Sequence, residues 1–361
     1  MHAGIRTLLG CFSGASRTFL QRPNKLGVRR IIRPFANAPH LLPMRILLVK
    51  TSSLGDVIHN LPVASDLRRQ FPGATIDWCV EESFADIPRL HPGIGAVIPV
   101  AIRRWRKSLL RAATWREIGV FKTRLSQTAY DAILDTQGLI KSGLITFFTR
   151  GPCYGYAAEV AREPMASYFY DKTFVIPPNA HAVERNRWLS AAAFDYPVDL
   201  PLDYGIAAPE LSFPWLPSNR HAVLTTATSR DDKLWSEAHW IAVAGHLIER
   251  GITPVLPSGS PVERQRAERI AAGASGSIAA PPLNLRELAA LIGHADLAVG
   301  VDTGLAHLAT ALNVPTIALY VSTDPALTGV HGVRNFRNLG GPGRAPGIAE
   351  VLAAIAQELR R

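Results

Sequence analysis

The stretch LAVGVDTGLAHLATALNVPTIALYVST (residues 297–323) decides the fold, because its pattern is that of a complete strand–helix–strand unit. Two apolar runs, LAVGVD and PTIALYVST, flank the helical pattern GLAHLATALN. Such a unit joins parallel strands of one sheet. The same alternation runs upstream, where Ser236 has the residue type of a helix N-cap and Asn284 and Glu287 have the spacing of a capping box. Residues 220–339 are therefore predicted to form a doubly wound α/β domain.

The first half of the chain repeats this scheme from Met44 onward. Its strand candidates are RILLVKT, TIDWCVEE, GAVIPVAI, YDAILDTQG and KTFVIP, so residues 44–204 are predicted to form a first Rossmann-like domain. The proline-rich residues 205–219 are predicted to be a linker, and residues 340–361 end in a helix that is a candidate to pack on the first domain. The predicted fold class is α/β, with two parallel-sheet domains facing a central cleft in which ligands bind.

Charge is distributed unevenly over the 361 residues, whose formal net charge is +10. Residues 1–43 hold seven Lys and Arg residues and no acid, which leaves 32 basic and 29 acidic residues in the remainder. A nucleic-acid partner is therefore not expected. Residues 1–43 resemble a transit peptide in composition, but we expect a disordered extension or a true start at Met44. No apolar run reaches the roughly 18 residues that span a bilayer, so any membrane contact is expected to be peripheral.

The usual fingerprints of nucleotide and cofactor binding are missing. No GxGxxG follows a strand, and GLIKSG (residues 138–143) has Ile140 where a Walker motif has glycine. Cys11, Cys79 and Cys153 lie far apart, which indicates neither a disulfide framework nor a zinc site and fits a reducing cytosol. A dehydrogenase or a P-loop enzyme is disfavoured, and we expect no metal and no cofactor.

One candidate anion site lies where a strand of the second domain ends. Asp302, Thr303 and Gly304 open a helix whose free N–H groups and positive dipole end suit a phosphate. His307 follows one turn later. An ordinary N-cap with a solvated histidine is the competing interpretation.

A second polar group follows the first strand of the same domain. Thr228, Ser229 and Lys233 combine hydroxyl groups with a cation, a set that suits a diphosphate leaving group. Glu263 lies beyond another strand end, although on its own it is typical of a surface helix.

In the first domain the unusual residue is Asp56, beside Gly55 in the turn KTSSLGD (residues 50–56). One interpretation is a general base that accepts a proton from an attacking hydroxyl. The other is a helix cap whose lowered pKa makes it a poor base.

A basic run, IRRWRK (residues 102–107), follows the third predicted strand, and Lys141 and Arg162 occupy other predicted loops. These residues could bind phosphates, nucleic acid or anionic lipid headgroups, or could form a solvated charged helix.

Several segments together resemble the lipopolysaccharide heptosyltransferase family, and within it heptosyltransferase I. They are MRILLVKTSSLGDVIHNLP, VIPVAIRRWRKS, DTQGLIKS, AREPMASYFY, HAVER, TSRDDKLW and VDTGLAHLATAL, in the family's order from Met44 to about Gly332. The resemblance implies a GT-B fold and a metal-independent, inverting transfer of L-glycero-D-manno-heptose from ADP-heptose to the Kdo of Kdo-bearing lipid A. It also implies a cytoplasmic enzyme that associates peripherally with the anionic inner membrane.

The resemblance assigns roles to individual positions. Asp56 matches the base, and Lys233 would stabilise the leaving diphosphate. The donor-contacting positions are Thr228, Ser229, Lys233, Glu263, Leu283, Asp302, Thr303, Gly304 and His307. The family often has Thr in place of Ser229 and Met in place of Leu283. The acceptor-binding candidates are Ser53, Gly55, Arg103, Arg104, Arg106, Lys107, Lys141 and Arg162.

Three alternatives stay open on the sequence. They are a heptosyltransferase II acting on the next heptose, a nucleotide-sugar epimerase on the same scaffold, and a basic nucleic-acid-binding protein.

Overall fold

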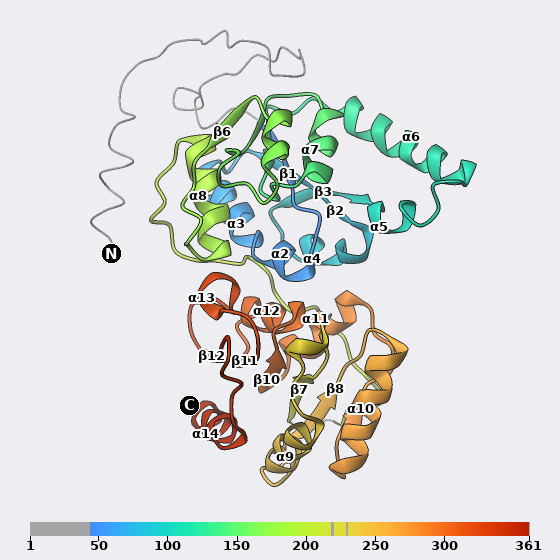
Figure 1. The fold of residues 1–361 in the computed structure, drawn as a ribbon, viewed down its shortest axis with the longest axis vertical. Helices are drawn as coiled ribbons and strands as arrows, with labels where there is room; N and C mark the ends of the chain where they lie inside the picture. The colour runs from blue at the N-terminus through green and yellow to red at the C-terminus, as the bar shows by residue number, and fades with distance from the viewer. Residues whose placement is uncertain (1–43, 218–219, 229, 361) are drawn as a thin grey trace.

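The computed structural model describes residues 44–217, 220–228 and 230–360, which form two parallel sheets of six strands each (Figure 1). The first sheet has the order β3-β2-β1-β4-β5-β6, and the second has the order β12-β11-β10-β7-β8-β9. Counted from its own first strand, each sheet has the order 3-2-1-4-5-6 of a Rossmann domain. The prediction of two doubly wound domains is confirmed, whereas residues 1–43 lie outside the described residues.

The first domain holds the first six strands and the helices between them. In chain order these are β1 (Arg45–Val49), α2 (Leu54–Ile58), α3 (Leu61–Gln70), β2 (Thr75–Glu81), η3 (Glu82–Phe84), α4 (Asp86–Arg89), β3 (Ile94–Val100), α5 (Ile102–Trp105), α6 (Ala112–Gln127), β4 (Ala132–Asp135), α7 (Ile140–Phe147), β5 (Cys153–Tyr156), η4 (Pro164–Phe169), β6 (Lys172–Phe174) and α8 (Ala182–Phe194). Helices cover both faces of this sheet, so β4 and β5 are buried throughout. Pro62, in the first turn of α3, lacks the N–H that would continue α2, and it thereby helps to separate these two helices.

The second domain repeats the arrangement. Its elements are β7 (His221–Thr225), η5 (Asp231–Lys233), α9 (Glu237–Ile248), β8 (Thr253–Leu256), α10 (Pro261–Gly273), β9 (Ile278–Ala279), α11 (Leu285–Gly293), β10 (Leu297–Val301), α12 (Gly304–Ala311), β11 (Thr316–Tyr320), α13 (Pro325–Thr328), β12 (Phe336–Gly340) and α14 (Ile348–Glu358). Ser236 is the N-cap of α9, and Asn284 and Glu287 form the capping box of α11, as predicted.

The last helix, α14, packs on the second domain, which corrects the expectation that it packs on the first. It lies against α9 and β11, with Val351, Ala354 and Ile355 buried in the core between them. Arg337 on β12 donates a hydrogen bond to Glu358 over 2.6 Å and fixes the end of the helix. The apolar stripe of α14 indicates that the helix must cover a sheet, but it does not indicate which sheet.

The two domains meet through the turns that follow their strands, and α2 lies against α12 (Figure 1). A Cβ on Gly304 would lie 2.6 Å from Leu54 Cγ, so a side chain at Gly304 would force Leu54 to move. Gly55 likewise lies against the ring of His307, with 3.1 Å from an ideal Cβ to Cδ2. The residues predicted to carry chemistry in the two domains are therefore neighbours in space.

Candidate active site

The turn after β1 holds the carboxylate of Asp56 in one position. Asp56 lies in the first turn of α2, and its side chain reaches back to Ser53, whose N–H and Oγ donate to Oδ2 over 2.9 and 3.0 Å. Arg162 Nη2 donates to the other oxygen, Oδ1, over 2.8 Å. Only 14% of the Asp56 side chain is exposed, so few orientations are open to it.

Two cations set the protonation state of this carboxylate. Burial raises the pKa of Asp56, but the charges of Lys50 and Arg162 and the hydrogen bond from the Ser53 N–H outweigh it, so the pKa lies below its usual range. Lys50 is itself buried and donates to the carbonyl oxygen of Thr136 over 2.7 Å. Burial lowers the pKa of Lys50 to about 8, against the raising effect of Asp56. Asp56 is therefore ionised at neutral pH and can accept a proton, although only as a weak base.

A small pocket opens beside Asp56 in the first domain. Its lining includes Arg162, Arg185 and Gln137. Arg185 Nη2 donates to the carbonyl oxygen of Val160, while its buried Nε has no partner among the described residues. A pocket with two guanidinium groups beside a carboxylate suits a ligand that carries both an anionic group and a hydroxyl group.

In the second domain, Asp302 lies directly after β10 and accepts two hydrogen bonds on Oδ2. Lys233 Nζ donates over 2.6 Å and Thr323 Oγ1 over 2.7 Å. Thr228 Oγ1 donates to the Asp302 carbonyl oxygen over 3.1 Å, which joins the turn after β7 to the turn after β10. The N-cap of α12, Thr303, makes no capping hydrogen bond with its side chain. A cation and a helix N-terminus thus lie together at the junction of β7 and β10, where doubly wound sheets bind phosphates.

His307 connects the two turns across the domain boundary. Its Nδ1 lies 3.1 Å from Nε2 of His59, at the end of α2. Burial lowers the pKa of His307 to about 4, while the charges of Asp302 and Asp56 act in the opposite direction. The imidazole is therefore neutral at neutral pH, and both carboxylates are near enough to affect its protonation.

The remaining acceptor-side candidates divide into two groups. Ser53, Gly55 and Arg162 surround Asp56, and Lys141 Nζ donates to Ser52 Oγ in the same turn over 2.6 Å. The basic run after β3 lies elsewhere: Arg104 pairs with Glu82 and Glu117 over 2.9 and 2.8 Å, and the Arg103 guanidinium lies over the ring of Phe84. Arg106 and Lys107 are exposed.

Two donor-side candidates, Glu263 and Leu283, make other contacts than with the pair of Lys233 and Asp302. Glu263 accepts a hydrogen bond from the Gly259 N–H over 2.7 Å in the first turn of α10. Leu283 packs, partly buried, against the hydrophobic core. Ser229 lies outside the described residues.

Sequence reasoning missed three side chains that contribute to this arrangement. They are His59, Arg185 and Thr323. Thr323 could have been found, because it follows the strand next to β10 in the sheet, at the same edge as Asp302. His59 and Arg185 lie in two of the segments that resemble the heptosyltransferase family, but neither of them was assigned a role from the sequence.

Comparisons with known proteins fit this geometry. The family model "Glycosyltransferase family 9 (heptosyltransferase)" matches residues 118–341. Lipopolysaccharide heptosyltransferase 1 of Pseudomonas aeruginosa is 46% identical over 294 residues, which cover 80% of this chain and 82% of that protein.

Two solved structures of the Escherichia coli heptosyltransferase WaaC are similar to this one. The structure with ADP has a TM-score of 0.80 and 40% sequence identity, and the match covers 88% of this chain and 99% of that one. The structure with ADP-2-deoxy-2-fluoro heptose has a TM-score of 0.77, with the same identity and coverage. The fold and the opposed turns define a two-domain glycosyltransferase of GT-B type. The chain belongs to glycosyltransferase family 9, the heptosyltransferase family.

Proposed function

We propose that this enzyme transfers L-glycero-D-manno-heptose from ADP-heptose to the Kdo of Kdo-bearing lipid A, with inversion at the anomeric carbon. The observation that carries the proposal is the opposition of Asp56 on one domain to Lys233 and the start of α12 on the other, with His307 between them. The P. aeruginosa relative is named heptosyltransferase 1, and WaaC was solved with an ADP-heptose analogue.

In this mechanism the two turns act on opposite sides of the anomeric carbon. Asp56 accepts the proton of the attacking hydroxyl as that oxygen bonds to the anomeric carbon, and the bond from this carbon to the diphosphate oxygen breaks. A weak base suits this step, because the hydroxyl becomes acidic only as its oxygen bonds to carbon. Lys233 and the N–H groups at the start of α12 stabilise the negative charge that develops on ADP.

The pocket beside Asp56 supports an acidic sugar as the acceptor. In this proposal, Arg162 and Arg185 would bind the Kdo carboxylate, and Asp56 would accept from the neighbouring hydroxyl. Ser53 and Gly55 lie in the turn that leads to Asp56, and Lys141 of α7 donates to Ser52 in that turn. The basic residues after β3 would meet the phosphates of lipid A.

The proposed acceptor is a membrane lipid, so the enzyme works at the cytoplasmic face of the inner membrane. Within the described part of the chain, no helix is long and apolar enough to cross a bilayer. We therefore propose peripheral association, driven by basic residues and anionic lipids.

Incubation of the purified protein with ADP-heptose and Kdo-bearing lipid A tests the proposal. The expected result is a lipid that gains the mass of one heptose. A second acceptor that already carries one heptose separates this activity from that of a heptosyltransferase II. A reaction without acceptor detects a nucleotide-sugar epimerase. If only the second acceptor gains mass, or if ADP-heptose is altered without any acceptor, the proposal is wrong.

A further inference from the structure

The connection between α5 and α6 projects from the first domain and exposes apolar side chains at its end. Figure 1 shows α6 extending away from the sheet, with its first turn outermost. Leu110 is fully exposed, and Leu109 and Trp115 are 48% and 59% exposed. Of the 16 residues of α6, only Thr114 and Leu125 are buried. We call residues 106–116 the apolar tip.

Hydrogen bonds within the apolar tip satisfy several of its polar groups. Trp115 Nε1 donates to the carbonyl oxygen of Leu109 over 2.8 Å, and Thr114 Oγ1 donates to the carbonyl oxygen of Ser108 over 2.8 Å. The N–H of Arg111 also donates to the Ser108 carbonyl oxygen, over 3.1 Å. Satisfied polar groups lower the cost of moving a segment from water into a lipid environment.

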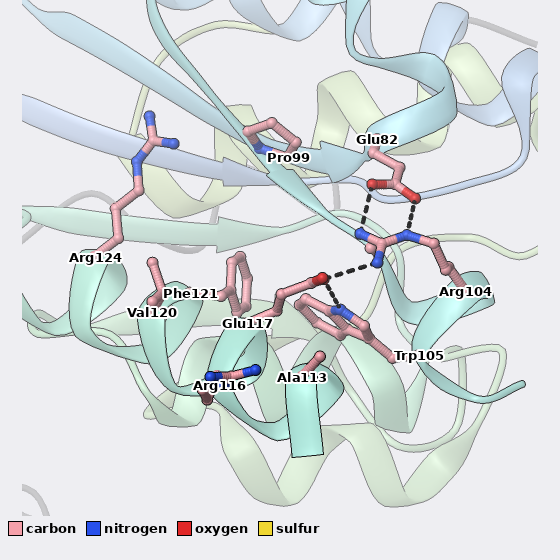
Figure 2. A pocket seen from close by; sticks show the side chains of 11 residues that line it. Glu82, Pro99, Arg104, Trp105, Ala113, Arg116, Glu117, Val120, Phe121 and Arg124 are labelled. Atoms are coloured by element: carbon pink, nitrogen blue, oxygen red, sulfur yellow. Dashed lines mark hydrogen bonds and ion pairs between the residues drawn. The ribbon is translucent and has the colours of Figure 1, made fainter. Parts of the chain in front are cut away.

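Basic residues surround the apolar side chains of the tip. Residues 106–116 contain Arg106, Lys107, Arg111 and Arg116 and no acidic residue. The nearest acid in the sequence, Glu117, accepts hydrogen bonds from Arg104 and from the indole of Trp105 over 2.8 and 2.9 Å, which offsets its charge (Figure 2). Exposed Leu and Trp within a ring of basic residues have the composition of segments that lie in the interface of anionic bilayers.

A pocket of about 480 Å³ lies behind the tip, and the carboxylates of Glu82 and Glu117 line it together with arginines, so it adds no net charge beyond that of the tip (Figure 2). Arg104, Arg116 and Arg124 line it, together with the apolar side chains of Val120 and Phe121. The bonds from Arg104 and Trp105 to Glu117 join α5 to α6 at this pocket, so they fix the position of the tip relative to the domain.

We propose that the apolar tip docks the enzyme on an anionic phospholipid bilayer, with Leu109, Leu110 and Trp115 among the lipid headgroups and acyl chains. The basic residues of the tip then lie at the level of the lipid phosphates. This inference rests on the proposed function, which places the acceptor in a membrane, and it assigns the contact to one surface of the first domain. Transfer to a detergent-dispersed acceptor does not need the apolar side chains of the tip.

Vesicle sedimentation of the full chain tests the inference. The wild type is expected to bind vesicles of equal parts phosphatidylglycerol and phosphatidylcholine and to bind pure phosphatidylcholine weakly. Leu110→Glu is expected to lower binding to the anionic vesicles by about tenfold or more, because burial of a leucine is lost and a like charge is added. Both proteins retain the seven basic residues of segment 1–43, so the difference reports on the tip.

The matched control is Val262→Glu, at a 76% exposed position on α10 of the second domain, which should bind as the wild type does. A second readout is quenching of tryptophan fluorescence by phosphatidylglycerol with brominated acyl chains, which should diminish in Trp115→Phe. The inference is overturned if Leu110→Glu binds normally, if Val262→Glu loses as much binding, or if quenching is the same in Trp115→Phe.

Transfer of heptose to detergent-dispersed acceptor is measured in parallel. The inference expects Leu110→Glu to retain the wild-type rate there. A loss of vesicle binding with normal transfer supports both proposals. Absence of transfer in the wild type refutes the proposed function and leaves the vesicle result to decide the docking surface on its own.

Discussion

The carboxyl ends of β4 and β10 occupy equivalent places in the two sheets, and an Asp-Thr pair leads into the turn at both, at residues 135–136 and 302–303. In the first domain, hydrogen bonds with other residues of the protein occupy the polar groups of this turn, and we call it the closed turn. Asp135 is fully buried and accepts hydrogen bonds from the N–H of Gln137 over 2.8 Å and from the hydroxyl of Tyr170 over 2.7 Å. Glu163 accepts a hydrogen bond from the N–H of Ile140, at the start of α7.

In the second domain the equivalent turn is left open. Asp302 pairs with Lys233 and Thr323, side chains from other turns, and Thr303 does not cap α12 with its side chain. Two turns with the same opening sequence thus differ in what occupies the start of the following helix. A helix start that already binds a carboxylate is a poor site for a phosphate, so the difference between the two turns favours our proposal that the donor binds on the second domain.

The largest expected effect is that of Asp56→Asn. This variant tests whether Asp56, in the turn after β1, is the catalytic base. Removal of the proton acceptor should lower kcat by roughly 10²- to 10⁴-fold. The affinity for ADP-heptose, measured by calorimetry, should change little, because the donor is expected on the other domain. Near-normal turnover would show that Asp56 is not the base.

Lys233→Met tests the open turn. Loss of the cation should lower kcat by roughly 10²- to 10³-fold and should also weaken binding of ADP, since a charge that stabilises the leaving diphosphate is gone. The matched control is Lys141→Met in the first domain, which should leave ADP affinity unchanged. Equal loss of ADP affinity in both variants would show that ADP binding depends on the first domain as much as on the second.

Acidic pH should destabilise the folded protein, because histidines are buried at the boundary between the domains. Burial lowers the pKa of His181 and of His307 to about 4, so each stays neutral in the folded protein where its unfolded form, with a pKa near 6.5, takes up a proton. The unfolded state therefore binds more protons between about pH 6.5 and pH 4. The free energy of unfolding should fall as the pH falls through this window, by roughly 1.4 kcal/mol per unit for each histidine.

Denaturant unfolding at several pH values measures this slope. His181→Gln removes one of the titrating histidines and should make the slope shallower. An unchanged slope in that variant would mean that His181 takes up its proton in the folded state as well.

Asp135→Asn tests the closed turn and should have the smallest effect on catalysis. An amide cannot accept all the hydrogen bonds that the Asp135 carboxylate accepts, so the free energy of unfolding should fall by about 1–3 kcal/mol. The affinity for ADP, measured by calorimetry at a temperature where the variant is folded, should stay as in the wild type. A clear loss of ADP affinity would indicate that the first domain also binds the donor.

The sequence predicted both sheets and most of the polar residues at their carboxyl ends, because strand and helix periods and helix caps are local signals. The pairing of Lys233 with Asp302 was not predicted as a contact, and neither were the contacts of His59, Arg185 and Thr323 with residues far along the chain. Such contacts depend on how strands order themselves in a sheet and on how two domains meet, which residue patterns do not encode.

For the basic run after β3, too, the sequence did not predict the contacts that its residues make. Its composition indicates an anion-binding surface, but Arg104 is already matched by Glu82 and Glu117. The placement of α14 on the second domain has a similar cause, because a helical apolar stripe is compatible with either sheet.

We expect the bond between Lys233 and Asp302 to affect which anions bind at the open turn. Lys233 and Asp302 balance each other's charge, so a simple inorganic anion that took Lys233 would leave the Asp302 carboxylate with only the hydrogen bond from Thr323. A nucleotide sugar brings hydroxyl donors along with its diphosphate, and such donors could compensate Asp302 as Lys233 turns to the phosphates. The ion pair would therefore favour a nucleotide sugar over free phosphate as the ligand of this turn.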